Sequence, residues 1–190
     1  MPGYAAHRGP GVVSPAVSPG PSTVGVVIQV PDPMGAEIAA VRAAAGDEFG
    51  YSIPTHVTLL PPTTVTAEQR VQFVQHLHAV TSAHRAFTVQ LAGTGTFRPT
   101  SDVVFLALAD GDDQCRSLAD DVCAGPVPSP SPFAYHPHVT LAHGIAPPLL
   151  DQVHSAQRGF AASFRVDDVC LYEMSESQVW RLHSRFPLGG

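Results

Sequence analysis

From residue 24 onward, apolar positions recur with the period of a β-strand in some segments and with the period of an α-helix in others. The β-branched run Val24–Val30 ends at Pro31 and predicts a strand, and the Ala-rich stretch 34–45 predicts a helix that ends near Gly46. The same patterns continue to the C-terminus. They predict further strands at 56–59, 87–97, 103–108, 138–141, 162–173 and 178–185, and helices from Thr66 to about Ala83, at 112–123 and at 148–157.

The order of these elements indicates an internal duplication. The tetrapeptide His-Val-Thr-Leu occurs at 56–59, closed by Pro61-Pro62, and again at 138–141. Each copy follows the first strand of its half by about 30 residues. Each half then has the order strand, helix, HVTL strand, helix, strand. We therefore expect an α+β fold with two similar halves.

The first 22 residues differ in composition from the rest of the chain. Twelve of them are Pro, Gly or Ser, and none is Asp or Glu. Such a segment buries too little apolar surface to offset the entropy lost on ordering. We expect a disordered arm over residues 1–22 and a single domain over residues 23–190.

The repeated tetrapeptide places two kinds of polar side chain on one face of a strand. Side chains in a strand alternate between faces, so His56 and Thr58 project to one side, and His138 and Thr140 do the same in the second copy. If the halves pack with twofold pseudo-symmetry, two imidazoles and two hydroxyls face each other across a cleft. One imidazole can then accept a proton, the other can donate one, and the hydroxyls can hold phosphate oxygens.

Chance explains one such match but not two in equivalent places. Ten histidines in this chain give roughly 0.6 expected His-x-Thr matches, so a single copy carries little weight. Two identical tetrapeptides in strand context carry much more. The competing interpretation is a pair of ordinary buried strands with incidental histidines.

The two motifs resemble those of the two-histidine (2H) phosphoesterase superfamily, and most closely its 2'-5' RNA ligase-like and cyclic phosphodiesterase branch. The resemblance covers about residues 24–186 in element order. It implies a bilobal, duplicated α+β fold in which two antiparallel sheets line a central cleft and helices cover the outer faces. It implies that His56 and His138 are the acid/base pair, with His56 protonating the leaving oxygen and His138 activating the nucleophile. Thr58 and Thr140 would bind the phosphate.

One position departs from the family pattern. Many relatives carry a basic residue, often Arg, shortly after the second motif, whereas this chain has Leu141-Ala142-His143-Gly144. His143 is therefore the candidate for that substrate-binding position. Tyr135 and His136, just before the second motif, are further candidates for the lining of the cleft.

Composition and charge limit the partners. The formal net charge is −6 with only ten Lys plus Arg, which argues against a surface for long duplex nucleic acid. A small nucleotide or an RNA terminus remains compatible as substrate. The three cysteines have no disulfide or zinc spacing, and no apolar run or signal peptide indicates a membrane. We expect a cytoplasmic monomer without a cofactor.

Three alternatives remain open to test. His136, His138 and His143 could form a metal site with His56, although no Asp or Glu flanks either motif. A Ser/His/Asp hydrolase lacks the G-x-S-x-G element. A non-catalytic module that binds a nucleotide or RNA end would keep the same cleft. The preferred hypothesis is a metal-independent phosphoesterase for a 2',3'-cyclic or 2'-5' phosphodiester.

Overall fold

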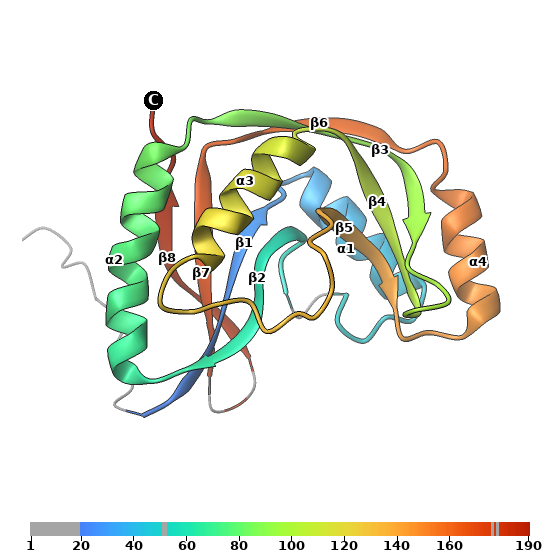
Figure 1. The fold of residues 1–190 in the computed structure, drawn as a ribbon. Helices are drawn as coiled ribbons and strands as arrows, with labels where there is room; N and C mark the ends of the chain where they lie inside the picture. Colours follow the sequence, from blue (N-terminus) through green and yellow to red (C-terminus); the bar gives the residue numbers. More distant parts are fainter. Residues whose placement is uncertain (1–19, 51–52, 176, 178) are drawn as a thin grey trace, which may run out of the picture.

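The computed structural model describes residues 20–50, 53–175, 177 and 179–190, and these form an α+β fold (Figure 1). Most of the predicted arm, residues 1–19, lies outside the described residues, and Ser22 already begins the first strand. The elements are β1 (Ser22–Gln29), α1 (Met34–Ala44), β2 (His56–Val65), α2 (Ala67–Ala83), β3 (Phe87–Thr96), β4 (Val103–Asp110), α3 (Asp112–Cys123), β5 (His138–His143), α4 (Pro147–Ala156), β6 (Ala161–Val166), β7 (Asp168–Met174) and β8 (Trp180–Pro187).

The strands form one antiparallel sheet in place of the two separate sheets that we expected. Its order is β6-β3-β4-β5-β2-β1-β7-β8. It consists of two four-stranded half-sheets, which meet between β2 and β5 at a single residue pair, Val57 and Val139. One half-sheet is β2-β1-β7-β8 and the other is β5-β4-β3-β6. The site motifs therefore begin the two strands that join the halves.

The two half-sheets do not correspond to the two halves of the sequence. Strand β3, from the first half, pairs with β4 and β6, while β7 pairs back to β1 and β8 pairs with β7. The predicted strand at 162–173 is in fact two strands, separated at Asp167, because the chain crosses there from one half-sheet to the other. Local periodicity fixes the face of a side chain but not the neighbouring strand.

The first motif strand is also longer than predicted. It continues through Pro61 and Pro62 to Val65. These prolines fall at an irregularity in the pairing of β2 with β1, where the register shifts between Val24 and Val26. A proline is tolerated at such a position because its missing N–H removes no regular ladder hydrogen bond.

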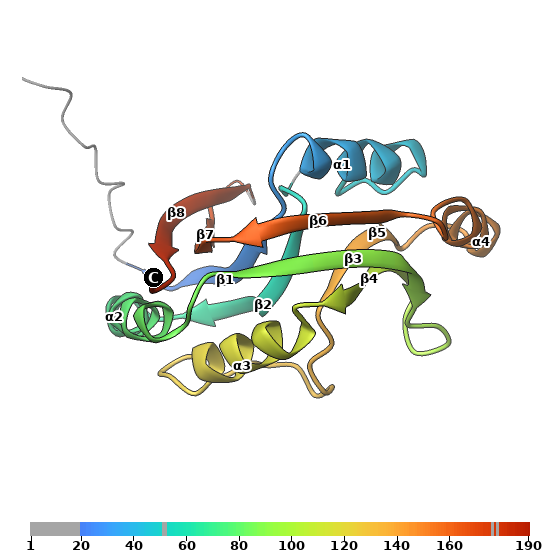
Figure 2. The same ribbon diagram turned by 90° about the horizontal axis from the view of Figure 1, so that it is seen from above.

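Helices cover the sheet on both sides and at both ends. Figure 2 shows α1 and α3 on opposite sides, with α2 and α4 toward the two ends. Helix α2 begins with the predicted capping box, since the Thr66 hydroxyl accepts from Gln69 N and the Gln69 side chain accepts from Thr66 N. No helix in the described part of the chain is long and apolar enough to cross a membrane.

Part of the main core lies on the sheet face opposite the motif histidines. Val57 and Val139 are fully buried, and the next residues in the same cross-strand row are also core residues: Ile28, Leu106, Val169 and Phe186. A second, smaller cluster of Val27, Cys170 and Tyr172, with Trp180 packed against it, lies on the motif face. Val57 and Val139 therefore anchor the two motif strands to the main core.

Candidate active site

The antiparallel pairing of β2 with β5 brings the four motif side chains together. Because Val57 pairs with Val139, His56 lies opposite Thr140 and Thr58 lies opposite His138. The burial pattern of both strands is the alternation predicted, with His and Thr half-buried and the intervening Val buried. Directly opposite residues have Cβ atoms roughly 5 Å apart, and the diagonal His56–His138 pair roughly 7–8 Å. The four side chains form a tetrad of a size that suits a phosphate group.

Both motif histidines are held by the same local hydrogen bond. Nδ1 of His56 donates to the carbonyl of Pro54 over 2.6 Å, and Nδ1 of His138 donates to the carbonyl of His136 over 2.7 Å. A ring whose Nδ1 carries the proton has its lone pair on Nε2 when neutral. The backbone two residues upstream therefore sets the tautomer and the ring orientation in each copy.

Burial favours the neutral form of both rings. Desolvation lowers the pKa of His56, and the positive charge of Arg42 lowers it further, against the opposing effect of the Pro54 carbonyl. Desolvation also lowers the pKa of His138, and positive charge on the neighbouring His136 and His56 lowers it further. Because each imidazolium disfavours a second one nearby, the pair suits a state with one base and one acid.

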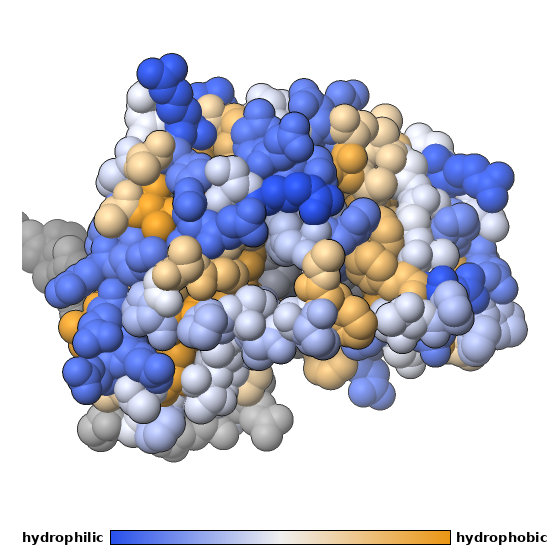
Figure 3. Space-filling view, viewed as in Figure 1, coloured by the Kyte–Doolittle hydropathy of each residue, from blue (hydrophilic) through white to orange (hydrophobic). Residues whose placement is uncertain are grey.

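A pocket of about 620 Å³ opens at one row of the tetrad, next to Thr58 and His138. Helix α3 and the segment 129–136 form its other walls, and Figure 3 shows the hollowed surface on this face of the molecule. His56 and Thr140, the other row, are not part of its lining. The pocket therefore approaches the tetrad from one side, and its size is that of a small-molecule site.

Aromatic rings surround His138. The ring of Phe97 lies edge-on to His138 at 4.9 Å between centroids, and Phe105 lies 5.3 Å from it. His136 contacts the same two phenyl rings at 5.5 and 5.3 Å. Gly95 makes this arrangement possible, since a Cβ there would lie 2.4 Å from the Phe105 ring. Phe97 is the one of these two phenyl rings that lines the pocket, and it gives the wall next to His138 an apolar ring against which a nucleobase or ribose could pack.

Tyr135 contacts the first motif through its hydroxyl. The Tyr135 hydroxyl donates to the Thr58 carbonyl over 2.9 Å, and its ring lines the pocket. Arg116 in turn donates to the Tyr135 carbonyl and pairs with Asp112. Burial raises the pKa of the Tyr135 hydroxyl, which stays protonated and keeps donating. Tyr135 thereby links the segment before β5 to the backbone of β2.

His143 is not brought into the pocket. It is exposed at the end of β5 opposite Val103, three residues beyond Thr140. Its role in substrate binding stays a prediction. The alternative metal site also lacks its geometry, because no three His, Cys, Asp or Glu side chains among the described residues are placed to hold one ion.

Sequence reasoning missed the neighbours that strand pairing gives to the tetrad. Gln29 pairs with His56 across β1 and β2, and Phe105 pairs with Thr140 across β4 and β5. Neither residue lies in a recognisable motif. Their places next to the tetrad follow from the register between strands. The only sequence signal for that register is the number of residues that separates each of them from the end of its strand.

Comparison with known proteins identifies relatives along most of the chain. The family model of the 2'-5' RNA ligase superfamily matches residues 30–178. Proteins named "Putative phosphoesterase" from Bacillus thuringiensis strain Al Hakam and from Bacillus cereus strain Q1 are each 25% identical over 143 residues. The matched region covers 72% of this chain and 80% of each relative.

Solved structures share the fold. Escherichia coli LigT complexed with NADP+ superposes with a TM-score of 0.65 at 24% identity, covering 90% of this chain and 99% of LigT. LigT complexed with 3'-AMP gives a TM-score of 0.63 at 21% identity over the same shares. A structure from Thermus thermophilus gives 0.63 at 22% identity, covering 88% of this chain and 98% of that one.

Proposed function

Because the chain belongs to the 2'-5' RNA ligase superfamily, we propose that it is a phosphoesterase that acts on a 2',3'-cyclic or 2'-5' phosphodiester of a small nucleotide or RNA end. The observation that carries this proposal is the tetrad. Two imidazoles of fixed tautomer and two hydroxyls lie on one face of two adjacent strands. These groups supply a base, an acid and phosphate ligands without further chemistry.

The tetrad supports a two-proton mechanism for opening a cyclic phosphate. Following the family resemblance, Nε2 of His138 takes the proton of the attacking water as the new P–O bond forms. Nε2 of a protonated His56 gives its proton to the 3' oxygen as the P–O3' bond breaks. The product carries a 2'-phosphate, and the proton has moved from His56 to the leaving oxygen while His138 has gained one.

The threonines suit the non-bridging oxygens of the phosphate. Each lies opposite a histidine, so Thr58 and His138 flank one side of the bound group and Thr140 and His56 flank the other. A hydroxyl donor aimed at charge that develops in the transition state lowers the barrier more than one that binds the ground state alone. The threonines would therefore contribute to turnover and not only to binding.

A small ligand fits the pocket better than a polymer. The pocket volume of about 620 Å³ is that of a nucleotide-sized site, and Phe97 and Tyr135 give it apolar walls. LigT, which shares the fold, is complexed with the nucleotides NADP+ and 3'-AMP. The net charge of −6 supports a nucleotide or an RNA terminus over a long duplex.

Turnover of 2',3'-cyclic nucleotides in the presence of EDTA tests the proposal. We expect the wild type to release a 2'-phosphate, and His56→Ala and His138→Ala to lose at least about 10²-fold in kcat, since general acid–base catalysis contributes that much. His154→Ala is the matched control, because His154 lies on α4 outside the pocket lining.

Two outcomes would contradict the proposal. Activity lost in EDTA and restored by a divalent cation would favour metal-assisted hydrolysis. Absence of turnover on cyclic and 2'-5'-linked substrates, with tight nucleotide binding retained, would favour a non-catalytic binding module.

A further inference from the structure

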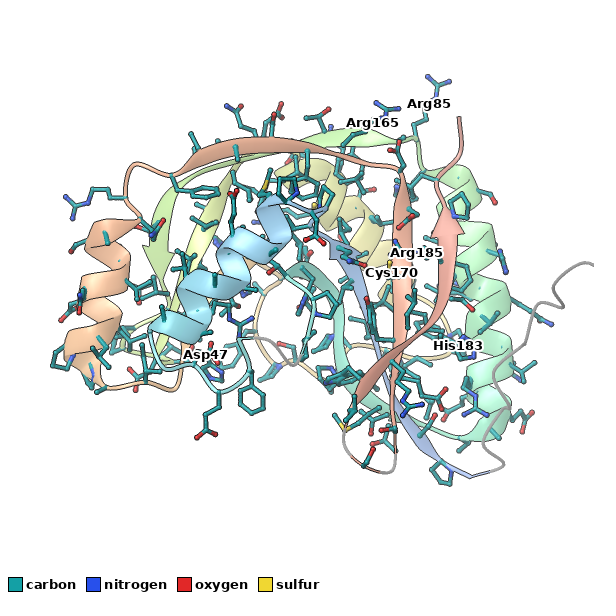
Figure 4. All side chains as sticks on the ribbon, turned by 180° about the vertical axis from the view of Figure 1, so that it is seen from behind. Asp47, Arg85, Arg165, Cys170, His183 and Arg185 are labelled. Atoms are coloured by element: carbon teal, nitrogen blue, oxygen red, sulfur yellow. The ribbon has the colours of Figure 1, made fainter. Side chains whose placement is uncertain are left out.

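The motif face of the sheet continues past the tetrad into the half-sheet that carries β1, β7 and β8. Register pairs connect Thr58 to Val27, Val27 to Cys170, and Cys170 to Arg185. Residues paired across antiparallel strands share a face, so Arg185 lies on the same face as the catalytic candidates. Figure 4 shows Arg185 and Cys170 next to each other on β8 and β7.

The Arg185 side chain extends from β8 to a residue of β1. Its Nη2 donates to Oε1 of Gln29 over 2.9 Å, and Gln29 is the residue that pairs with His56. Its Nη1 donates to the Asp168 carboxylate over 3.1 Å and to the Cys170 sulfur over 3.3 Å. Arg185 itself lies on β8, three strands from β2, so its long side chain brings a positive charge to the β1 residue that pairs with His56.

The same contacts orient Gln29. Its Oε1 accepts from the Tyr172 hydroxyl over 3.3 Å as well as from Arg185. An amide oxygen that accepts two hydrogen bonds fixes the orientation of the whole amide, so the Nε2 donors face away from Arg185 and Tyr172. Gln29 pairs with His56 across β1 and β2, so its side chain starts from the backbone position next to that histidine.

Arg185 also keeps donor capacity for a ligand. A guanidinium has five N–H groups, and the contacts to Asp168, Cys170 and Gln29 use Nη1 and one hydrogen of Nη2. The Arg185 side chain is 45% exposed, so a ligand can reach it. By contrast, Arg42 pairs with a fully buried Asp47 and is itself 9% exposed, which leaves no access for an anion.

We propose that Gln29 and Arg185 form an anion subsite beside His56, which binds a second phosphate of the substrate. This inference rests on the proposed function, since it takes the tetrad as the site of the first phosphate. The cation of this subsite comes from β8, the last strand of the fold. The second phosphate is either a 5'-phosphate on the same nucleoside or the next phosphodiester of an RNA end.

Equilibrium binding of product nucleotides tests the subsite without any need for turnover. The probes are adenosine 2'-monophosphate, adenosine 2',5'-bisphosphate and the dinucleotide ApA with a terminal 2'-phosphate. A hydrogen bond between charged groups is strong enough to change Kd roughly tenfold. We expect the wild type to bind one of the two longer probes about tenfold more tightly than the monophosphate, and which one it prefers identifies the source of the second phosphate.

Variants separate the subsite from general effects. Arg185→Gln should abolish the preference, and Arg185→Lys should retain part of it through the remaining charge. Arg165→Gln is the matched control, since Arg165 is an exposed, carboxylate-paired arginine on β6, and it should keep the full preference. Thermal unfolding of each variant verifies that it is folded.

The outcomes of the two proposals are distinguishable. Equal Kd values for all three probes on the wild type, or an undiminished preference in Arg185→Gln, would overturn the anion subsite even if cyclic nucleotides are hydrolysed. A preference that depends on Arg185 supports the subsite even if no substrate is turned over, in which case only the proposed activity fails.

Discussion

The two motif histidines are held alike but lose their charge for partly different reasons. Each donates Nδ1 to a carbonyl two residues upstream, and burial lowers each pKa. Arg42 adds to the effect at His56, whereas His136 adds to it at His138. The acid–base behaviour of the site therefore depends on residues outside the repeated tetrapeptide.

The first prediction concerns the pH dependence of activity. Both histidine pKa values lie below the ordinary value of 6.5, and the active state needs one neutral and one protonated ring. We expect kcat/KM to be maximal below pH 6.5 and to fall as the pH rises above it, because the acid loses its proton. A pH–rate profile of the free enzyme measures this.

A variant at His136 identifies which limb of the pH–rate profile belongs to His138. His136→Phe removes the neighbouring titratable ring while keeping an aromatic side chain, so the pKa of His138 should rise and one limb should move to higher pH. A profile in which both limbs move together, or neither moves, would contradict this account of His138.

Tyr135 gives a second prediction at this scale. Tyr135→Phe keeps the ring in the pocket and removes the donor to the Thr58 carbonyl. We expect a loss of about 0.5–1.5 kcal/mol in the free energy of unfolding and a decrease of up to about tenfold in kcat/KM, since Thr58 is less well positioned. Denaturant unfolding and steady-state kinetics measure the two effects. Unchanged kinetics with reduced stability would limit Tyr135 to a structural role.

At the scale of elements, strand pairing places a glycine directly opposite a phenylalanine of the site. Gly95 on β3 lies opposite Phe105 on β4, and the phenyl ring occupies the space where a side chain at Gly95 would be. The ring in turn contacts His138. The geometry of one catalytic candidate therefore depends on the absence of a side chain two strands away.

A third prediction follows from this pairing. Gly95→Ala would place a Cβ 2.4–2.5 Å from Phe105 ring atoms, so the ring must shift, at a cost of about 1–3 kcal/mol in stability. We expect kcat/KM to fall as well, because the shift moves the aromatic wall at His138. Gly159→Ala, where a Cβ meets nothing within 4 Å, is the control for the glycine-to-alanine change itself.

The sequence was sufficient for the polar faces of the motif strands and insufficient for their neighbours. Strand alternation alone places His56 with Thr58 and His138 with Thr140, because it depends only on adjacent residues. The positions of Gln29 and Arg185 depend on pairings between strands that are up to about 150 residues apart. The same limit explains why the break at Asp167 and the single sheet were not predicted.

At the scale of the whole molecule, an ion pair connects helix α2 to strand β7. Nη1 of Arg70, which is 2% exposed, donates to Glu173 over 2.7 Å and to Ser22 over 3.1 Å. These residues come from α2, β7 and β1, so the contacts of Arg70 connect a helix to two strands of one half-sheet.

The fourth prediction addresses this connection. Glu173→Gln weakens the charge pairing of a buried arginine, and we expect a loss of about 1–2 kcal/mol in the free energy of unfolding with kcat/KM unchanged at temperatures well below Tm. Asp151→Asn, in the exposed pair with Arg98, should change stability by less than about 1 kcal/mol. Equal losses of stability in Glu173→Gln and Asp151→Asn would contradict the expectation that the buried ion pair contributes more to stability than the exposed one.

The single pairing between Val57 and Val139 has a mechanical consequence for the site. Within each half-sheet, several residue pairs join neighbouring strands, whereas one pair joins the two halves across β2 and β5. Since each half carries one motif histidine, the packing of the halves against each other sets the distance between His56 and His138. A phosphate bound by both rows of the tetrad would contact both halves at once, so substrate binding would also fasten the two halves to each other.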